Sequence, residues 1–79
     1  MPLFYFHLFN DQDVMDREGT DLPDAGAAGA YASQLAQFEA GESVKSSGRI
    51  VLSHRIDVED KDYRPVTTVW FRDVVHVEQ

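Results

Sequence analysis

The chain has 79 residues, 43% of them hydrophobic, and it contains five Phe, three Tyr and one Trp. A chain this short forms one hydrophobic core, so we expect a single domain over residues 1–79, and its apolar and aromatic content excludes intrinsic disorder. The absence of cysteine excludes disulfides, thiolate catalysis and cysteine-bound metal sites, and the formal charge of −7 disfavours binding to nucleic acid.

The first predicted element is a strand over residues 3–9, a segment rich in Phe and Tyr, which have high strand propensity. Residues 10–13 are turn formers, and residues 14–18 are predicted to pair back as a short second strand. The apolar run is far shorter than a membrane span and has no basic flank typical of a signal peptide. We therefore expect a cytoplasmic protein with no membrane partner.

The second part of the chain, residues 23–40, is rich in alanine and predicts the single helix of the fold. Asp21 or Asp24 can cap its first N–H groups, and Pro23 is tolerated near its start. Gly41 predicts its end. Apolar residues at helical spacing predict one apolar stripe that comprises Ala28, Tyr31, Ala32, Leu35 and Phe38.

The last part of the chain predicts a loop and two strands. The polar segment 42–49 is expected to be a loop, and residues 50–59 alternate between apolar and polar side chains as in a half-buried strand. Residues 60–63 predict a turn. A long final strand is expected over residues 66–77, with Pro65 at its beginning and a bulge at Asp73.

The element order β-β-α-β-β predicts an α+β fold of two layers, an antiparallel-rich sheet with one helix packed on one face. If Phe4 and Phe6 face the helix, strand alternation leaves an open face on the other side. That face is predicted to carry Tyr5, His7, Arg55, Trp70 and Arg72. Aromatic residues and arginine are enriched at protein interfaces, so we predict that these five residues form a binding surface.

A resemblance to a known family is carried by four segments, Met1–Leu8, Glu18–Asp24, Ile56–Asp60 and Phe71–Asp73. They cover almost the whole chain and resemble a family of small uncharacterised proteins, found mainly in alphaproteobacteria and classed as a domain of unknown function. The resemblance implies a self-contained domain and supplies no catalytic residue. The helix is richer in glycine and alanine than this resemblance leads us to expect.

Two clusters could be read as metal sites. His7, His54 and His76 all fall on predicted strands, but His7 and His54 face opposite sides of the sheet, which disfavours a shared site. Residues 10–18 are similar to a calcium-binding loop, yet Asp16 occupies the glycine position and Leu22 stands in place of the closing glutamate. We expect no metal and no other cofactor.

Enzymatic chemistry finds little support in the sequence. The acidic residues from Asp57 to Asp62 have Arg55, Lys61 and Arg64 among them, which favours a surface charge ladder over a paired-carboxylate site. The sequence contains no nucleophile elbow, phosphate-binding glycine loop or His-Glu-x-x-His motif. We expect a protein that is not an enzyme.

Two functions remain as hypotheses. The first is a protein-protein interaction or assembly module whose partner is a second copy or another protein, bound on the open face of the sheet. The alternative is an acidic regulatory partner of a basic protein, such as an antitoxin or a nucleic-acid mimic, which the negative charge favours. Stacking of nucleic-acid bases on Trp70 and Tyr5 is disfavoured by that same charge.

Overall fold

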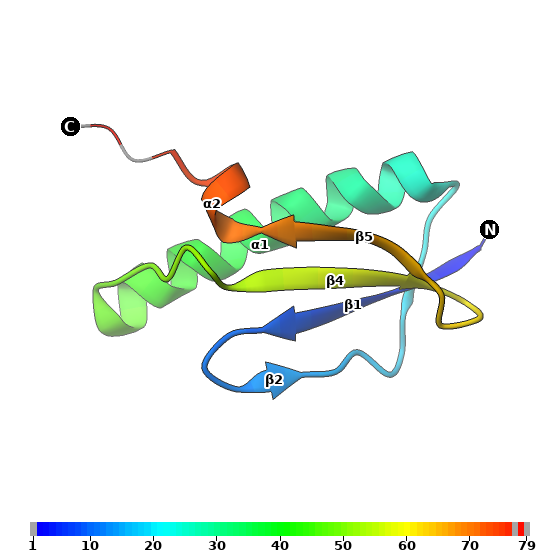
Figure 1. The fold of residues 1–79 in the computed structure, drawn as a ribbon, viewed down its shortest axis with the longest axis horizontal. Helices are drawn as coiled ribbons and strands as arrows, with labels where there is room; N and C mark the ends of the chain where they lie inside the picture. The colour runs from blue at the N-terminus through cyan, green and yellow to red at the C-terminus, as the bar shows by residue number, and fades with distance from the viewer. Residues whose placement is uncertain (1, 77, 79) are drawn as a thin grey trace.

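The computed structural model describes residues 2–76 and residue 78, and it confirms the α+β fold with two layers (Figure 1). The main strands of the sheet follow the order β2-β1-β4-β5. They are β1 (Leu3–Phe9), β2 (Asp13–Val14), β4 (Arg55–Asp60) and β5 (Pro65–Trp70). A two-residue strand, β3 (Thr20–Asp21), also pairs with β1, and every pairing is antiparallel.

The first strand lies where the sequence predicts it, but the second is shorter than predicted. β2 ends at Val14 instead of continuing to Glu18. The chain between β2 and β3 leaves the ladder, and the side chain of Asp16 bonds to β1 in its place.

The single long helix, α1 (Ala25–Ser47), begins where predicted and ends later. Asp24 caps its start, since the Asp24 carboxylate accepts a hydrogen bond of 2.8 Å from the N–H of Ala27. The helix continues through Gly41 to Ser47, so the predicted loop over residues 42–49 is wrong except at its last two residues. Gly48 ends it with a left-handed φ of 72°, and its N–H donates to the carbonyl of Val44. Gly41 does not have a positive φ and lies inside the helix, because glycine permits a left-handed cap without requiring one.

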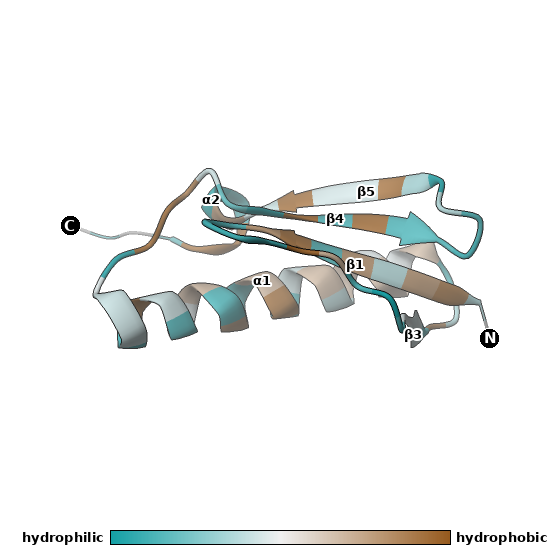
Figure 2. Cartoon of the chain, turned by 90° about the horizontal axis from the view of Figure 1, so that it is seen from below, coloured by the Kyte–Doolittle hydropathy of each residue, from teal (hydrophilic) through white to brown (hydrophobic). Residues whose placement is uncertain are grey.

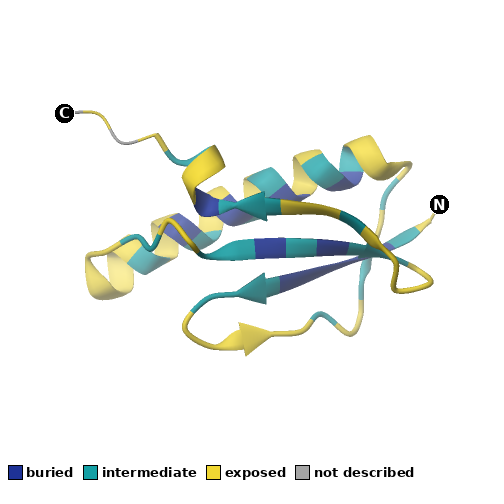
Figure 3. Cartoon of the chain, in the orientation of Figure 1, coloured by how far each residue is buried: buried dark blue, intermediate teal, exposed yellow. Residues whose placement is uncertain are grey.

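The buried stripe of α1 differs from the predicted one. Four alanines at four-residue spacing, Ala28, Ala32, Ala36 and Ala40, are buried against the sheet, as the alternating colours along α1 in Figure 3 indicate. Phe38 is 60% exposed and Tyr31 is 37% exposed, so the predicted apolar stripe does not turn inward as one surface. Small side chains let the helix backbone approach the sheet closely, and this contact decides which of two neighbouring apolar stripes turns inward.

The core lies between the two layers, which Figure 2 shows edge-on with α1 on one side of the sheet. The alanine stripe packs on large apolar side chains from three parts of the chain, namely Phe4 and Phe6 of β1, Ile56 and Val58 of β4, and Phe71 after β5. Ile56 and Val58 are buried as the predicted alternation requires. The far side of the sheet has no helix on it among the described residues (Figure 2).

The strand after α1 starts later than predicted because the helix is longer than the sheet. A helix of 23 residues spans about 34 Å, whereas the six residues of β4 span about 20 Å. The chain must travel back along the overhanging end of α1, so residues 50–54 form a connection and β4 begins at Arg55.

The final strand is also shorter than predicted. β5 ends at Trp70, and a short helix, α2 (Phe71–Val74), replaces its second half, so the bulge predicted at Asp73 is wrong. The N–H groups of Phe71 and Arg72 donate to the carbonyls of His54 and Leu52, which turns the chain away from the ladder. A register irregularity occurs instead between Val58 and Glu59. Residue 77 of the predicted strand lies outside the described residues.

Candidate functional site

The candidate site is the sheet surface that points away from α1, which we call the far face. Strand alternation buries Phe4 and Phe6 against α1 and therefore places Tyr5 and His7 on the far face. The register of β1, β4 and β5 arranges this face in three rows, which are Phe9, Arg55 and Trp70, then His7, Asp57 and Thr68, and finally Tyr5, Glu59 and Pro65.

The first row stacks arginine on aromatic rings. The guanidinium carbon of Arg55 lies 4.2 Å from the ring centre of Phe9 and 5.6 Å from that of Trp70. Arg72, at the start of α2, lies 4.6 Å from the centre of the Trp70 ring. We call Phe9, Arg55, Trp70 and Arg72 the arginine–tryptophan patch. Three of these residues were predicted for the site, and Phe9 follows from the same strand alternation.

In the second row, the carboxylate of Asp57 finds its hydrogen-bond donors within the far face. Asp57 Oδ1 accepts hydrogen bonds from Arg55 Nε at 3.2 Å and from Thr68 Oγ1 at 3.1 Å. This carboxylate therefore fixes the orientation of Arg55 above the two aromatic rings. It also places a negative charge directly beside the patch.

In the third row, Tyr5 is covered by Tyr63, a residue that was not predicted for the site. The ring of Tyr63 stacks on Tyr5 with their centres 5.2 Å apart, and Tyr5 in turn lies parallel to His7 at 6.3 Å. Tyr63 adopts a φ of 62°, a left-handed conformation that costs roughly 1 kcal/mol for a residue other than glycine. The side-chain hydrogen bond with Tyr63 and burial both raise the pKa of Tyr5 above its ordinary value of 10.0. Tyr63 itself stays 65% exposed.

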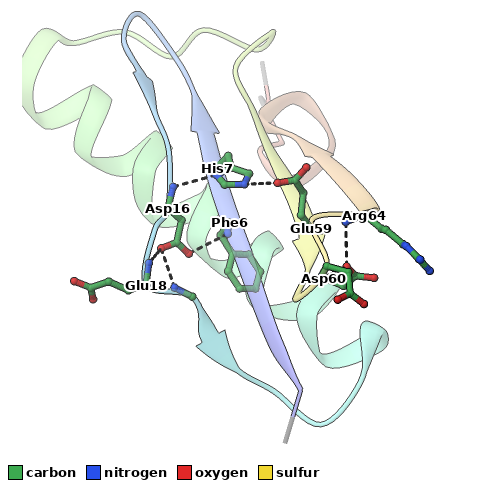
Figure 4. A network of polar contacts seen from close by, with 9 residues as sticks. Phe6, His7, Asp16, Glu18, Glu59, Asp60 and Arg64 are labelled. Atoms are coloured by element: carbon green, nitrogen blue, oxygen red, sulfur yellow. Dashed lines mark hydrogen bonds and ion pairs between the residues drawn. The ribbon is translucent and has the colours of Figure 1, made fainter.

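His7 bridges two separate segments across the far face (Figure 4). Its Nδ1 atom accepts a 3.0 Å hydrogen bond from the N–H of Asp16, and its Nε2 atom lies 2.6 Å from Glu59 Oε1. A backbone N–H can only donate, so Nδ1 carries no proton and Nε2 donates to the carboxylate. Both ring nitrogens of this neutral histidine are thus occupied, and His7 serves as a structural bridge.

Asp16 holds the segment between β2 and β3 against β1 (Figure 4). Its carboxylate accepts hydrogen bonds from the backbone N–H groups of Phe6, Glu18 and Gly19, each 3.1 Å long. Partial burial raises the pKa of Asp16, but these three hydrogen bonds outweigh it and lower the pKa below its ordinary value of 3.8.

The other histidines lie apart from His7. The rings of His54 and Phe71 meet edge to face with their centres 5.6 Å apart, and His54 Nε2 lies 3.6 Å from Asp11 Oδ1. His76 Nε2 lies 3.7 Å from Glu78 Oε1. In the part of the chain that the structure describes, no three side chains of the types His, Cys, Asp and Glu gather in a way that could hold a metal ion.

The five residues predicted for the binding surface differ in accessibility. His7 and Tyr5 are only 5% and 9% exposed, because the Asp16 segment and Tyr63 cover them. Arg55 and Trp70 are half-buried, and Arg72 is exposed. The accessible part of the far face therefore includes the arginine–tryptophan patch and Tyr63, with the exposed Thr68 and Pro65 beside them. That these residues bind a partner stays a prediction.

Comparisons with known proteins place the chain in a family. No curated protein and no solved structure gives a significant match. Among the described residues, no helix is both long and apolar enough to cross a membrane. A family model described as a domain of unknown function, DUF6894, matches residues 3–72, a span that contains every strand and the whole of α1. The chain therefore belongs to the DUF6894 family, which agrees with the resemblance seen in its sequence.

Proposed function

We propose that this protein is an interaction and assembly module that associates with a second copy of itself through the far face. The observation that supports this is the arginine–tryptophan patch, in which Trp70 stacks beside two guanidinium groups on a face that no described helix covers. Tryptophan, tyrosine and arginine are the residues most often found at the energetic centres of protein interfaces.

The distribution of charge favours a second copy as the partner. The chain as a whole carries −7, but the far face mixes signs, with Arg55 and Arg72 beside Trp70 in the first row and Asp57 and Glu59 in the following two rows. Two copies related by a twofold axis can set the arginines of one against the carboxylates of the other, because each side offers both signs. A uniformly charged partner would match only half of this surface.

The size of the face limits the affinity. Three strands of about six residues give a surface of roughly 20 by 14 Å, or about 280 Å² per copy, which is well below the roughly 800 Å² per partner of a standard interface. We therefore expect a weak dimer with a Kd of tens of micromolar, on the order of 50 µM.

Sedimentation equilibrium over about 5 to 500 µM would test this proposal. We expect the wild type to dimerise over this range, and the variants Arg72→Glu and Trp70→Ala to raise the Kd about tenfold or more. Val44→Ala, which truncates an exposed residue of α1 away from the far face, should leave the Kd unchanged. A wild type that stays monomeric throughout, or variants that dimerise like Val44→Ala, would refute self-association through this face.

A second candidate function is favoured by the overall charge. An acidic protein of this size, with a pI near 4.6, has the electrostatic character of a regulatory partner that neutralises a basic protein. Capture experiments from a native extract at low salt, where such attraction is strongest, test this candidate. Failure to retain any basic protein under those conditions argues against it.

A further inference from the structure

The long helix carries a second apolar stripe beside the buried alanines. Tyr31, Leu35 and Phe38 follow one another at i, i+4 and i+7, the spacing of a seam on which another helix packs. Leu35 packs partly against the core, and the Tyr31 ring lies 4.7 Å from the ring of Phe6. Phe38 projects from the same flank and is 60% exposed.

This flank of α1 borders a hollow that we call the flank groove. The helix lies closest to β4 and β5, and the sheet extends past it on the side of β1 and β2. Phe4 and Phe6 of β1 are buried under α1, whereas Leu8 is only partly buried. Between α1 and residues 14–20 lies a hollow of about 530 Å³. Its apolar lining comprises Phe6, Leu8, Val14, Met15, Tyr31 and Leu35. Val14 and Met15 are half-exposed, so large apolar side chains reach solvent on both walls.

The rim of the flank groove is acidic. Glu18 and Glu39 line it opposite each other, one from the segment before β3 and one from α1, together with the single cation Arg17. Among the residues that the structure describes, neither glutamate has a cationic side chain within 4.0 Å. Glu39 also borders a second hollow of about 400 Å³, which continues along α1 past Glu42.

We propose that the flank groove binds a basic amphipathic helix of another protein. The apolar stripe of that helix packs on Tyr31 and Leu35, which line the groove, and on Phe38, which is exposed on the same flank of α1 outside the lining. Its lysines or arginines lie beside Glu18 and Glu39. A second copy of this chain is a poor occupant, because two flank grooves face to face would bring the glutamates of one copy against those of the other. This proposal does not depend on self-association through the far face.

Fluorescence anisotropy with labelled 16-residue peptides tests the proposal directly. The first peptide has leucine at i, i+3, i+4 and i+7 positions and lysine elsewhere. The second replaces the lysines by glutamates, and the third scrambles the first so that its leucines form no stripe. We expect a Kd of tens of micromolar for the first peptide, and binding at least about tenfold weaker for the other two.

Variants of the protein locate the binding site. Phe38→Ser combined with Met15→Ser should weaken binding of the first peptide about tenfold, and Glu39→Lys about fivefold. Val44→Ser combined with Leu52→Ser is the matched control, because these residues are 46% and 42% exposed and lie outside the groove. Asp62→Lys, in the exposed turn between β4 and β5, is the control for the change of charge. Both controls should bind within about twofold of the wild type.

Several outcomes would overturn the proposal. Equal binding of the scrambled peptide would show electrostatic attraction without a helix-shaped site, and equal binding of the glutamate peptide would show no role for the acidic rim. Absence of binding of the first peptide up to about 1 mM would refute the site itself. The far-face variant Arg72→Glu should bind this peptide as the wild type does. A protein that binds the peptide without dimerising, or dimerises without binding the peptide, would therefore separate the two proposals.

Discussion

The two edges of β1 are held in different ways. Along one edge, β4 pairs with β1 through six consecutive residues, from Phe4 with Asp60 to Phe9 with Arg55. Along the other edge, β2 and β3 each contribute two residue pairs, and the gap between them is bridged by the carboxylate of Asp16. The first edge spreads its stabilisation over a ladder. The second edge has shorter ladders and depends more heavily on the side chain of Asp16.

Asp16→Ala should have the largest effect. Three backbone N–H groups lose a charged acceptor, so we expect the free energy of unfolding, measured by urea denaturation, to fall by about 3 kcal/mol. Asp13→Ala, at an exposed position of β2, is the control and should change it by less than about 0.5 kcal/mol.

Hydrogen exchange locates this effect within the sheet. In Asp16→Ala, the Phe6 amide should lose protection beyond the global destabilisation, because its acceptor is removed. Equal unfolding free energies for the Asp16 and Asp13 variants would show that the ladder with β4 alone holds β1.

Gly19→Ala should have the next largest effect. Gly19 has a φ of 77°, and a Cβ there would lie 2.8 Å from Leu3 Cγ and 3.1 Å from the carbonyl oxygen of Phe4. We expect a loss of about 2 kcal/mol in thermal or urea unfolding. Gly41→Ala is the matched comparison, because its Cβ would meet no atom within 4 Å and alanine favours the helix. It should stabilise the protein by about 1 kcal/mol, and the opposite order would contradict the structure.

Acid pH should weaken the Asp16 edge by a smaller amount. The hydrogen bonds at Asp16 lower its pKa below the ordinary value of 3.8, so its stabilising contribution is present above that value and is lost as the pH falls through the folded-state pKa. Between about pH 4 and pH 2, the wild type should therefore lose more unfolding free energy than Asp16→Asn, which has no such titration. Parallel stability curves for the two proteins would exclude a role for this carboxylate.

Much of the architecture follows from local pattern. The aromatic run of β1, the Asp24 cap and the alternation around Ile56 and Val58 each depend on residues close in sequence, and all are confirmed. Alternation also placed Tyr5 and His7 on the face away from α1.

Features that depend on the lateral position of α1 could not be predicted from the sequence. Phe38 has the correct helical spacing for burial, but the alanine stripe allows closer approach and takes the inner position. The flank groove depends on α1 lying closest to β4 and β5 and on residues 14–20 lying beside it. The spacing of apolar residues along a helix does not indicate which strands the helix covers.

Asp16 was missed for a different reason. Its bond to Phe6 joins residues ten positions apart, and the sequence marks no such pair. Its bonds to Glu18 and Gly19 are local, and an aspartate followed closely by glycine is a turn signature that could have identified it. Likewise, Tyr63 lies in a turn, where strand alternation gives no orientation for its ring.

The alanine stripe also has an evolutionary consequence. Ala28, Ala32, Ala36 and Ala40 have at most 2% of their surface exposed, so a larger side chain at any of them would push α1 off the sheet. Substitutions accepted over time should accumulate on the outer flank of α1 and spare these four positions, where only residues as small as alanine, serine or glycine fit. This chain can thus change what its helix presents to other molecules while the spacing of its two layers stays fixed.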